Sequence, residues 1–331
     1  MPSLTMNMQT LANRIVAGDR RALSRAITLV ESSREDHREQ ALELSEHLRH
    51  SRKHAIRIGL SGTPGVGKST FIESFGMHLT ASDLRVAVIA VDPSSVRSGG
   101  SILGDKTRME RLSRNKNAFI RPSPSQSHLG GIARRTREVV NICDAAGFDV
   151  ILIETVGVGQ SETIVAQISD LFALLLAPAG GDELQGVKRG IMEMADLILV
   201  NKADGDLVAA ATRTCTDFTG AIRLLRKRPQ DPDEYPKVLK VSAVQESGLV
   251  DAWEAMTNLI DWRKEHGFFA HTRREQAQFW FEEDVRQGLL AQLNAPKLEA
   301  LMKKLGQDVI NGTILPEKAA GMVLNEITQE T

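Results

Sequence analysis

Short, largely apolar runs alternate with segments of helical periodicity between residues 56 and 241. The runs are Ile56–Leu60, Val86–Val91, Asp149–Ile153, Leu171–Ala177, Leu197–Val200 and Val238–Val241, with Ala118–Arg121 as a weaker candidate. The helices expected between them include Lys68–Leu79, Gly131–Ala145, Leu184–Met194 and Val208–Lys227. Because the runs do not alternate apolar with polar residues, they fit strands that are buried on both faces. The pattern predicts an α/β fold with a doubly wound, mostly parallel sheet.

Both flanks of this region read as helical. Apolar residues recur at helical spacing between Leu11 and Leu48, and no further strand pattern follows Leu249. The charged tract Arg34–Gln40 is expected to be a solvated turn or the start of a helix. We therefore predict a helical N-terminal extension over residues 1–54, an α/β domain over 55–262 and a helical C-terminal arm over 263–331.

Composition narrows the classes of partner. The formal net charge of −1 gives no reason to expect nucleic acid or an anionic membrane as the main partner. The two cysteines, Cys143 and Cys215, are far apart, which favours a reducing compartment without disulfides or structural zinc. No apolar run approaches the roughly 18 residues of a spanning helix, and the N-terminus lacks the apolar core of a secretory signal. We expect a cytoplasmic protein that binds neither nucleic acid nor membrane.

A phosphate-binding motif joins the first predicted strand to the first predicted helix of the α/β region. The residues Gly62, Thr63, Pro64, Gly65, Val66, Gly67, Lys68, Ser69 and Thr70 match the pattern GxxxxGK(S/T). Glycines in such a loop allow backbone N–H groups to turn toward a phosphate at the helix N-terminus. Lys68 would then place its charge on the β- and γ-phosphate oxygens, and the Ser69 hydroxyl would bind Mg²⁺. The strand before the motif and the helix after it favour this function over a surface turn.

Two acids stand where a phosphate loop needs a metal-binding carboxylate. Asp92 and Glu154 are each the first polar residue after a predicted strand, at the edge of the sheet where ligands bind. Each can bind Mg²⁺ or its waters, although a solvated strand-end acid is the alternative. The segment from Glu154 to Gly157 also resembles the DxxG element of GTPases with Glu in place of Asp. The Gly157 N–H would face the γ-phosphate.

A second motif indicates the base. Asn201, Lys202, Ala203 and Asp204 follow a predicted strand and form an NKxD pattern. The Asp204 carboxylate can accept from guanine N1–H and from the 2-amino group, neither of which adenine has. After the last strand, Ser242 and Ala243 fit a further GTPase element that contacts the guanine. Found in this order, the motifs predict an enzyme that hydrolyses GTP to GDP and phosphate with Mg²⁺.

Longer segments resemble one family. Val91–Ser95, Gly99–Arg108, Glu154–Glu162 and Gly180–Lys188 look like the MeaB/ArgK GTPases, bacterial relatives of the methylmalonic aciduria type A protein. The resemblance covers nearly the whole chain. It implies a homodimer built by the C-terminal arm and a partner, an adenosylcobalamin-dependent mutase, most often methylmalonyl-CoA mutase. It implies a GTPase that acts as a chaperone, gating cofactor delivery and protecting the mutase from inactivation.

The resemblance also assigns individual residues. It makes Asp92 and Asp105 the Mg²⁺ and switch acids and Glu154 the acid at the end of the neighbouring strand. From the residues alone, Asp105 fits a helix N-cap equally well, because Lys106–Arg114 follows it. The segment ending at Lys188 resembles a third switch, in which Lys188 either acts like an arginine finger or is a solvated helix residue. The candidate catalytic set is then completed by Lys68 and Gly157.

Aromatic residues concentrate in the predicted arm and its approach, which suits an interface or packing onto the chain's own α/β domain. They include Trp262, Phe268, Phe269, Phe279, Trp280 and Phe281. Three other functions compete with the mutase chaperone. A metal-delivery GTPase would need a Cys/His cluster that the sequence lacks, and NKAD argues against an ATP-dependent kinase of a transport protein. A non-enzymatic scaffold would bind the nucleotide without releasing phosphate.

Overall fold

The computed structural model describes residues 7–32, 34–91, 109–122, 129–155, 161–178, 189–224 and 227–329. The chain divides into two compact units, Met1–Arg273 and Arg274–Thr331, here called the first and the second unit. The predicted domain boundaries at 54/55 and 262/263 stay predictions.

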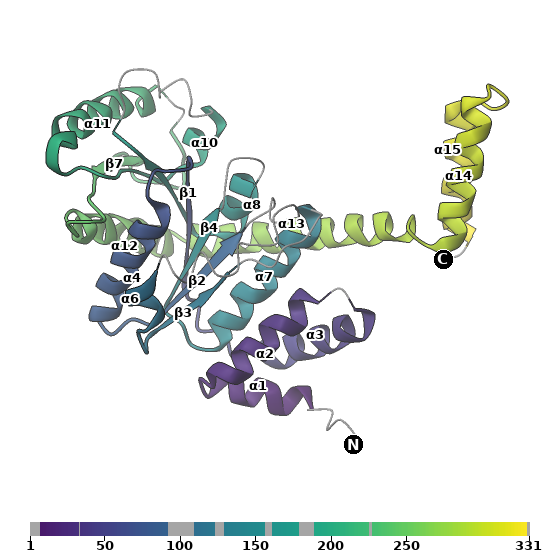
Figure 1. Cartoon of the computed structure of the whole chain (residues 1–331), viewed down its shortest axis with the longest axis horizontal. Helices are drawn as coiled ribbons and strands as arrows, with labels where there is room; N and C mark the ends of the chain where they lie inside the picture. The colour runs from purple at the N-terminus through teal and green to yellow at the C-terminus, as the bar shows by residue number, and fades with distance from the viewer. Residues whose placement is uncertain are drawn as a thin grey trace. The chain divides into compact units, whose positions relative to one another are not determined.

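A parallel sheet forms the centre of the first unit (Figure 1). In the described part of the chain it has seven strands in the order β3-β2-β4-β1-β5-β6-β7, and every neighbouring pair is parallel. The strands are β1 (Ile56–Gly62), β2 (Val86–Val91), β3 (Ala118–Arg121), β4 (Val150–Thr155), β5 (Leu171–Leu176), β6 (Leu197–Val200) and β7 (Lys237–Lys240). Every residue of β2, β4 and β5 is buried, as expected for strands covered on both faces. The predicted doubly wound fold is confirmed, including the weaker strand candidate at Ala118–Arg121.

Helices cover both faces of the sheet. On one face lie α4 (Lys68–Ala81), α6 (Glu110–Ser113) and α12 (Leu249–Glu265). On the other lie α7 (Leu129–Ala145), α8 (Ser161–Ile168), α10 (Arg189–Met194) and α11 (Val208–Ile222), the last preceded by the 3₁₀ turn η2 (Gly205–Leu207). This division follows from right-handed crossovers between parallel strands. In the core under the first face, the rings of Phe71 and Phe75 stack 5.2 Å apart, and Trp253 of α12 meets Phe75 edge-on.

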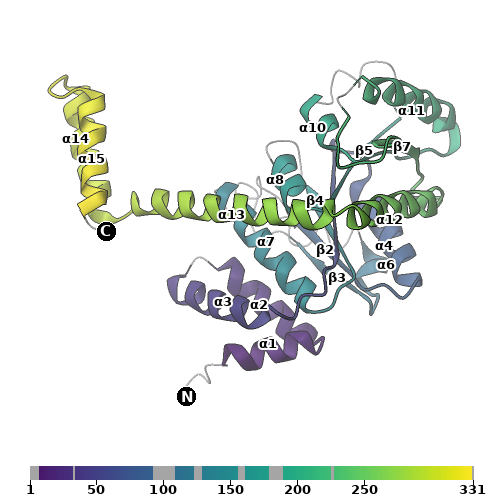
Figure 2. The same ribbon diagram turned by 180° about the vertical axis from the view of Figure 1, so that it is seen from behind.

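The N-terminal helices form an additional layer on α7. They are α1 (Met8–Val16), α2 (Arg20–Glu31) and α3 (Glu35–Leu48), drawn in purple beside α7 in Figure 2. The Arg121 guanidinium at the end of β3 pairs with the buried Glu31 carboxylate, and Arg38 of α3 pairs with Glu138 of α7. The expected helical character of this region is confirmed, and the charged tract from Arg34 is the start of a helix.

Buried ion pairs lie at the amino ends of the three strands β1, β5 and β6. The Asp170 carboxylate, just before β5, accepts from the backbone N–H of Arg57 in β1 (2.8 Å) and from the guanidinium of Arg273 (2.7 Å). The Asp196 carboxylate, just before β6, accepts from the guanidinium of Arg263 on α12 (2.6 Å). Each of these buried carboxylates is paired with a guanidinium and hydrogen-bonded, which offsets the free-energy cost of burying it.

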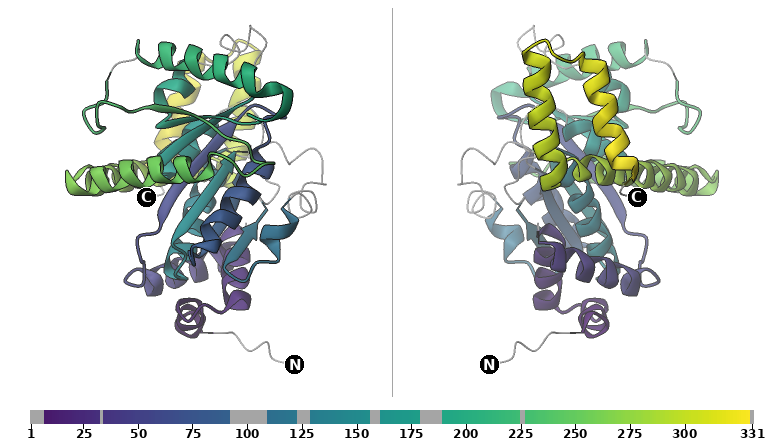
Figure 3. Two further views of the ribbon diagram at one scale, coloured as in Figure 1. Left: turned by 90° about the vertical axis from the view of Figure 1, so that its left-hand side faces the viewer. Right: turned by 90° about the vertical axis from the view of Figure 1, so that its right-hand side faces the viewer.

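The second unit is helical. It contains the later part of α13 (Phe268–Gln292), which begins in the first unit, followed by α14 (Pro296–Ile310) and α15 (Pro316–Gln329). The last two pack side by side, as the yellow pair in Figure 3 shows, and bury Leu298, Leu305 and Ala319. The predicted helical run after Leu249 is confirmed as far as Gln329. Within the described ranges, none of the helices has the length and the hydropathy needed to span a bilayer.

Candidate nucleotide site

The predicted phosphate loop lies between the carboxyl end of β1 and the first turn of α4. Gly65 and Gly67 have φ values of 84° and 90°, in the left-handed region that glycine adopts without strain. The Lys68 ammonium group donates to the carbonyl oxygens of Gly62 (2.6 Å) and Thr63 (3.3 Å). The loop therefore curls around its own lysine at the N-terminus of a helix, where anions bind.

Burial sets the electrostatics of Lys68. Only 9% of this residue is exposed. Burial lowers the pKa of Lys68 below its ordinary value, although the nearby carboxylates of Glu154 and Glu162 act in the opposite direction. A poorly hydrated cation gains most from a polyanion such as a phosphate chain, because little hydration is lost when the two meet.

Glu154 lies next to the loop, on the strand beside β1. In the sheet register it is the partner of Leu60, two residues before Gly62. The sequence placed Glu154 after its strand, whereas the structure has it inside β4 and 4% exposed. Its Oε1 atom lies 3.5 Å from the Ser69 Oγ atom. The phosphate loop thus has a hydroxyl and a carboxylate oxygen side by side at the start of α4.

The NKAD motif is hydrogen-bonded to the phosphate loop. The Asn201 side chain donates to the Val66 carbonyl oxygen (3.0 Å) and accepts from the Ala243 N–H (3.1 Å). The Lys202 backbone is left-handed (φ 56°), and its ammonium group donates to the Gly65 carbonyl oxygen (2.7 Å). The two motifs predicted separately from the sequence therefore form one assembly.

A short loop after β7, here called the base loop (Ser242–Ser247), holds Asp204. The Ser242 hydroxyl donates to the Asp204 carboxylate and accepts from the Gln245 N–H (3.1 Å). A paired backbone contact between Ser242 and Ser247 closes the loop. The Asp204 carboxylate is thereby held from one side by the base loop.

Sequence reasoning missed the contribution of Ser74 to this loop. The buried Ser74 of α4 donates its hydroxyl to the Ala243 carbonyl oxygen (2.7 Å). The only signal in the sequence was a small polar residue within an apolar stretch of a predicted helix. That pattern is equally common where a hydroxyl bonds to its own helix.

The remaining predicted residues, Asp92, Asp105, Gly157 and Lys188, lie outside the described residues. Across the described ranges, no three His, Cys, Asp or Glu side chains gather as a possible metal-binding group.

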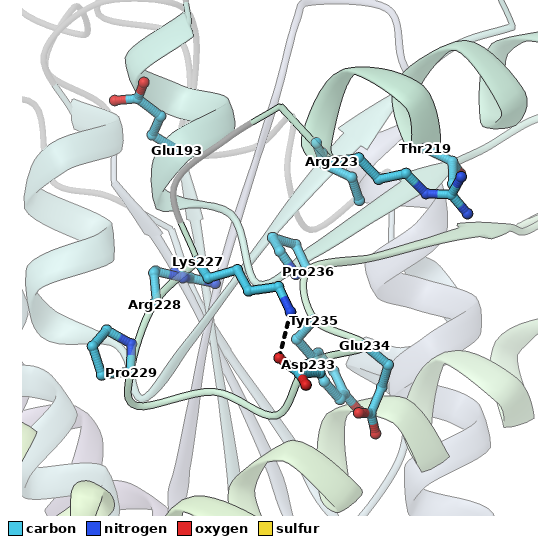
Figure 4. A pocket seen from close by; sticks show the side chains of 11 residues that line it. Glu193, Thr219, Arg223, Lys227, Arg228, Pro229, Asp233, Glu234, Tyr235 and Pro236 are labelled. Atoms are coloured by element: carbon cyan, nitrogen blue, oxygen red, sulfur yellow. Dashed lines mark hydrogen bonds and ion pairs between the residues drawn. The ribbon is translucent and has the colours of Figure 1, made fainter.

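A cavity of about 810 Å³ lies away from this assembly, between α10, the end of α11 and the segment before β7 (Figure 4). Charged side chains of both signs line it, among them Glu193, Arg223 and Lys227, whose ammonium group pairs with Asp233 (2.5 Å). None of the predicted site residues that the structure describes is part of its wall. The cavity is therefore separate from the nucleotide motifs.

Known proteins resemble this chain over nearly its whole length. A putative GTPase of Caulobacter vibrioides is 50% identical over 320 residues, covering 96% of this chain and 97% of the relative. The mouse mitochondrial methylmalonic aciduria type A homolog is 45% identical over 321 residues, covering 94% and 77%, respectively. A crystal structure of an LAO/AO transport system kinase has a TM-score of 0.75 and 34% identity, covering 99% of both chains.

A family model gives the most direct assignment. The model for the methylmalonyl-CoA mutase-associated GTPase MeaB matches residues 23–297. The match takes in the phosphate loop, the NKAD motif, the base loop and the whole sheet. With the hydrogen-bonded assembly described above, it shows that this chain is a P-loop GTPase that binds guanine nucleotide and belongs to the MeaB family.

Proposed function

We propose that this GTPase hydrolyses GTP with Mg²⁺ and acts as a nucleotide-gated chaperone of an adenosylcobalamin-dependent mutase, methylmalonyl-CoA mutase. In this role it assists cofactor loading and protects the mutase from inactivation. One observation carries the proposal: a model of mutase-associated GTPases matches residues 23–297, the region in which the phosphate loop and NKAD motif are hydrogen-bonded together. The name of the mouse relative, a methylmalonic aciduria type A homolog, supports the same partner.

Each described motif residue receives a role in binding GTP. Lys68 moves its ammonium group from the loop carbonyls to the β- and γ-phosphate oxygens, while loop N–H groups bind the β-phosphate. Asp204, held by Ser242, accepts from guanine N1–H and the 2-amino group. Asn201 keeps the two loops in register.

The oxygen groups next to the phosphate loop fit Mg²⁺. This hard cation prefers oxygen ligands and is usually held by one or two carboxylates together with substrate phosphates. The Ser69 hydroxyl and the Glu154 carboxylate, 3.5 Å apart, would hold it, with Asp92 and Asp105 as the further acids that the family resemblance implies. When bound, Mg²⁺ neutralises charge that develops on the β- and γ-phosphate oxygens. The Gly157 N–H and Lys188 would bind the γ-phosphate oxygens during hydrolysis.

Base specificity tests the nucleotide half of the proposal. In the Asp204→Asn variant, the amide can donate to the 2-oxo group of xanthine but cannot accept both guanine protons. We expect its affinity for GTP to fall by at least about 100-fold and its affinity for XTP to rise, since buried unpaired groups discriminate strongly. Calorimetry with GTP, XTP and ATP measures this, and a variant that still prefers GTP would contradict the assigned role of Asp204.

The mutase half needs the partner itself. We expect purified methylmalonyl-CoA mutase to accelerate phosphate release by this chain. We also expect the affinity between the two proteins to differ between the complex with a non-hydrolysable GTP analogue and the complex with GDP. Association that is absent with both nucleotides, together with an unchanged rate, would remove the chaperone function while leaving the GTPase intact.

The homodimer is a proposal for the second unit. Its helices expose large apolar side chains, including Phe281 (69% exposed), Leu289 (53%) and Leu324 (62%). Exposed apolar groups in such number favour burial against a partner, and the family resemblance points to a second copy of this chain. Sedimentation of the purified chain should give twice the 36.3 kDa of one chain. The Leu289→Asp variant should sediment more slowly.

One solved relative favours a second candidate. The crystal structure that covers 99% of this chain carries the name of a transport system kinase. GTP labelled in the γ-phosphate separates the two functions. A kinase would leave label on a protein, whereas the proposed GTPase releases it as inorganic phosphate.

A further inference from the structure

The base loop is supported on two sides. On its inner side, Ser242 bonds to Asp204 and Ala243 bonds to Asn201 and Ser74, as described above. On its outer side, the Glu246 carboxylate accepts from the Arg111 guanidinium of α6 at 2.7 Å. No motif predicted from the sequence includes this second contact.

Arg111 projects from a firmly packed helix. Its backbone N–H donates to the Glu73 carboxylate of α4 (2.7 Å). The next residue, Leu112, is fully buried against Gly76 of α4, where an added Cβ would lie only 2.6 Å from the leucine side chain. Thus α4, the helix that begins with Lys68, fixes α6, and α6 in turn holds Arg111 beside the base loop.

Glu246 occupies the part of the loop that most needs support. Its φ of 54° is left-handed, which a residue with a side chain adopts only when its surroundings hold it there. The ion pair with Arg111 and the Ser242–Ser247 contact both restrain this turn. Glu246 lies four residues after Ser242 in the same closed loop. A change at Glu246 can therefore alter the position of Ser242.

We propose that Arg111 is a positioning residue for guanine binding, acting through Glu246 on the base loop and so on the carboxylate of Asp204. The inference rests on the proposed guanine-binding role of Asp204. Arg111 itself touches neither base nor phosphate in this scheme. The side chains of Arg111 and Glu246 are 57% and 46% exposed. Exposed pairs of this kind change an equilibrium by about 1.5- to 5-fold, so a modest effect is expected.

The chain contains a matched control directly after the same helix. Arg114, the C-cap of α6, is also exposed and pairs with Glu110 of α6, four residues away, without contacting the base loop. We expect Arg111→Ala to weaken GTP binding by about 2- to 5-fold and Arg114→Ala to leave it unchanged. Glu246→Ala should lower the affinity for GTP as much as Arg111→Ala does. The double variant should bind GTP no less tightly than either single variant. The charge reversal R111E/E246R should restore part of the affinity.

A comparison of GTP with ITP separates positioning from general stability. ITP lacks the 2-amino group, so the preference for GTP over ITP reports how well Asp204 is placed. We expect Arg111→Ala to narrow this preference, while a variant that is merely less stable would bind both nucleotides less tightly in the same proportion. In salt of about 0.5 M, the preference of the wild type for GTP over ITP should fall toward that of the Arg111→Ala variant, because salt screens exposed ion pairs.

The outcomes distinguish this inference from the proposal beneath it. If the wild type itself shows no preference for GTP over ITP, the assigned role of Asp204 fails. If that preference exists and Arg111→Ala equals Arg114→Ala in both affinity and preference, Arg111 has no positioning role. Additive losses for Arg111→Ala and Glu246→Ala would also overturn it.

Discussion

The Lys202 ammonium group donates a hydrogen bond to the carbonyl oxygen of Gly65, 2.7 Å away. This contact links the motif that selects the base to the loop that binds the phosphates. The left-handed backbone of Lys202 (φ 56°) turns the side chain toward the loop. Together with the bond from the Asn201 side chain to the Val66 carbonyl oxygen, this contact couples affinity for the base to affinity for the phosphates.

Replacing Lys202 with methionine keeps the aliphatic stem and removes the bond. We expect affinity for both GTP and GDP to fall about tenfold, because a hydrogen bond to a charged group contributes ~1.5 kcal/mol. Calorimetry with each nucleotide measures this. The Lys264→Met variant, which removes an exposed ammonium paired with Asp261, is the control. Wild-type affinity in the Lys202 variant would show that the contact is unimportant.

The two left-handed glycines of the phosphate loop should differ in their tolerance of alanine. A Cβ on Gly67 would lie 2.8 Å from the Asn201 Nδ2 atom, whereas a Cβ on Gly65 would have no atom within 4 Å. Both changes cost about 1 kcal/mol of backbone strain. Only Gly67→Ala also displaces the amide that joins the two loops. We expect it to weaken GDP binding at least about tenfold more than Gly65→Ala, measured with a fluorescent GDP. Equal losses would contradict the contact.

Alkaline pH should destabilise the protein partly through Cys143. Complete burial raises the pKa of this thiol from 9.0 to about 12. Between these values the unfolded chain has lost the proton and the folded chain keeps it. The stabilisation is therefore present below pH 9 and is lost as pH rises toward about 12, by up to ~1.4 kcal/mol per pH unit.

Urea unfolding at about pH 8 and about pH 10.5 checks this prediction. The Cys143→Ala variant should show a shallower loss of stability over that range. Some loss remains in the variant, because burial also raises the pKa of Tyr235 to about 12. Identical pH dependence in the wild type and the variant would rule out the thiol as a source.

The buried Arg263 should be a major determinant of stability. Its guanidinium pairs with Asp196 (2.6 Å) and Asp231 (2.5 Å), and only 9% of its side chain is exposed. Arg263→Met leaves two buried carboxylates to share the guanidinium of Arg228, so we expect a loss of ~3 kcal/mol in the free energy of unfolding. Urea unfolding at neutral pH measures it. Arg286→Met, which breaks an exposed pair with Glu283, should change stability by less than about 1 kcal/mol.

The sheet and its motifs were predictable because their signals are local. A fully buried parallel strand reads as a continuous apolar run, and β2 and β5 were found on that basis. Glu154 shows where the signal ends: the polar residue predicts the end of the strand, yet β4 continues to Thr155. A carboxylate that faces a phosphate loop interrupts the hydrophobic pattern without interrupting the backbone ladder.

The contacts between distant segments were not predictable. Asp170 and Arg273 are 103 positions apart, and nothing in the spacing of charged residues says which ones meet. The same holds for Arg111 and Glu246, which are 135 positions apart. Such pairs depend on the three-dimensional register of helices on the sheet, a property that a single sequence does not display.

The strand β1 begins at Ile56, beside the Asp170 carboxylate that accepts from the Arg57 backbone N–H and pairs with Arg273, and ends at Gly62 of the phosphate loop, roughly 20 Å away at about 3.3 Å per residue. The buried ion pairs that stabilise the fold and the loop that binds the nucleotide thus lie at opposite ends of one strand. A library of substitutions restricted to the amino edge of the sheet would change the melting temperature and spare the nucleotide contacts. The thermal stability of the enzyme and its affinity for nucleotide could in this way be changed independently.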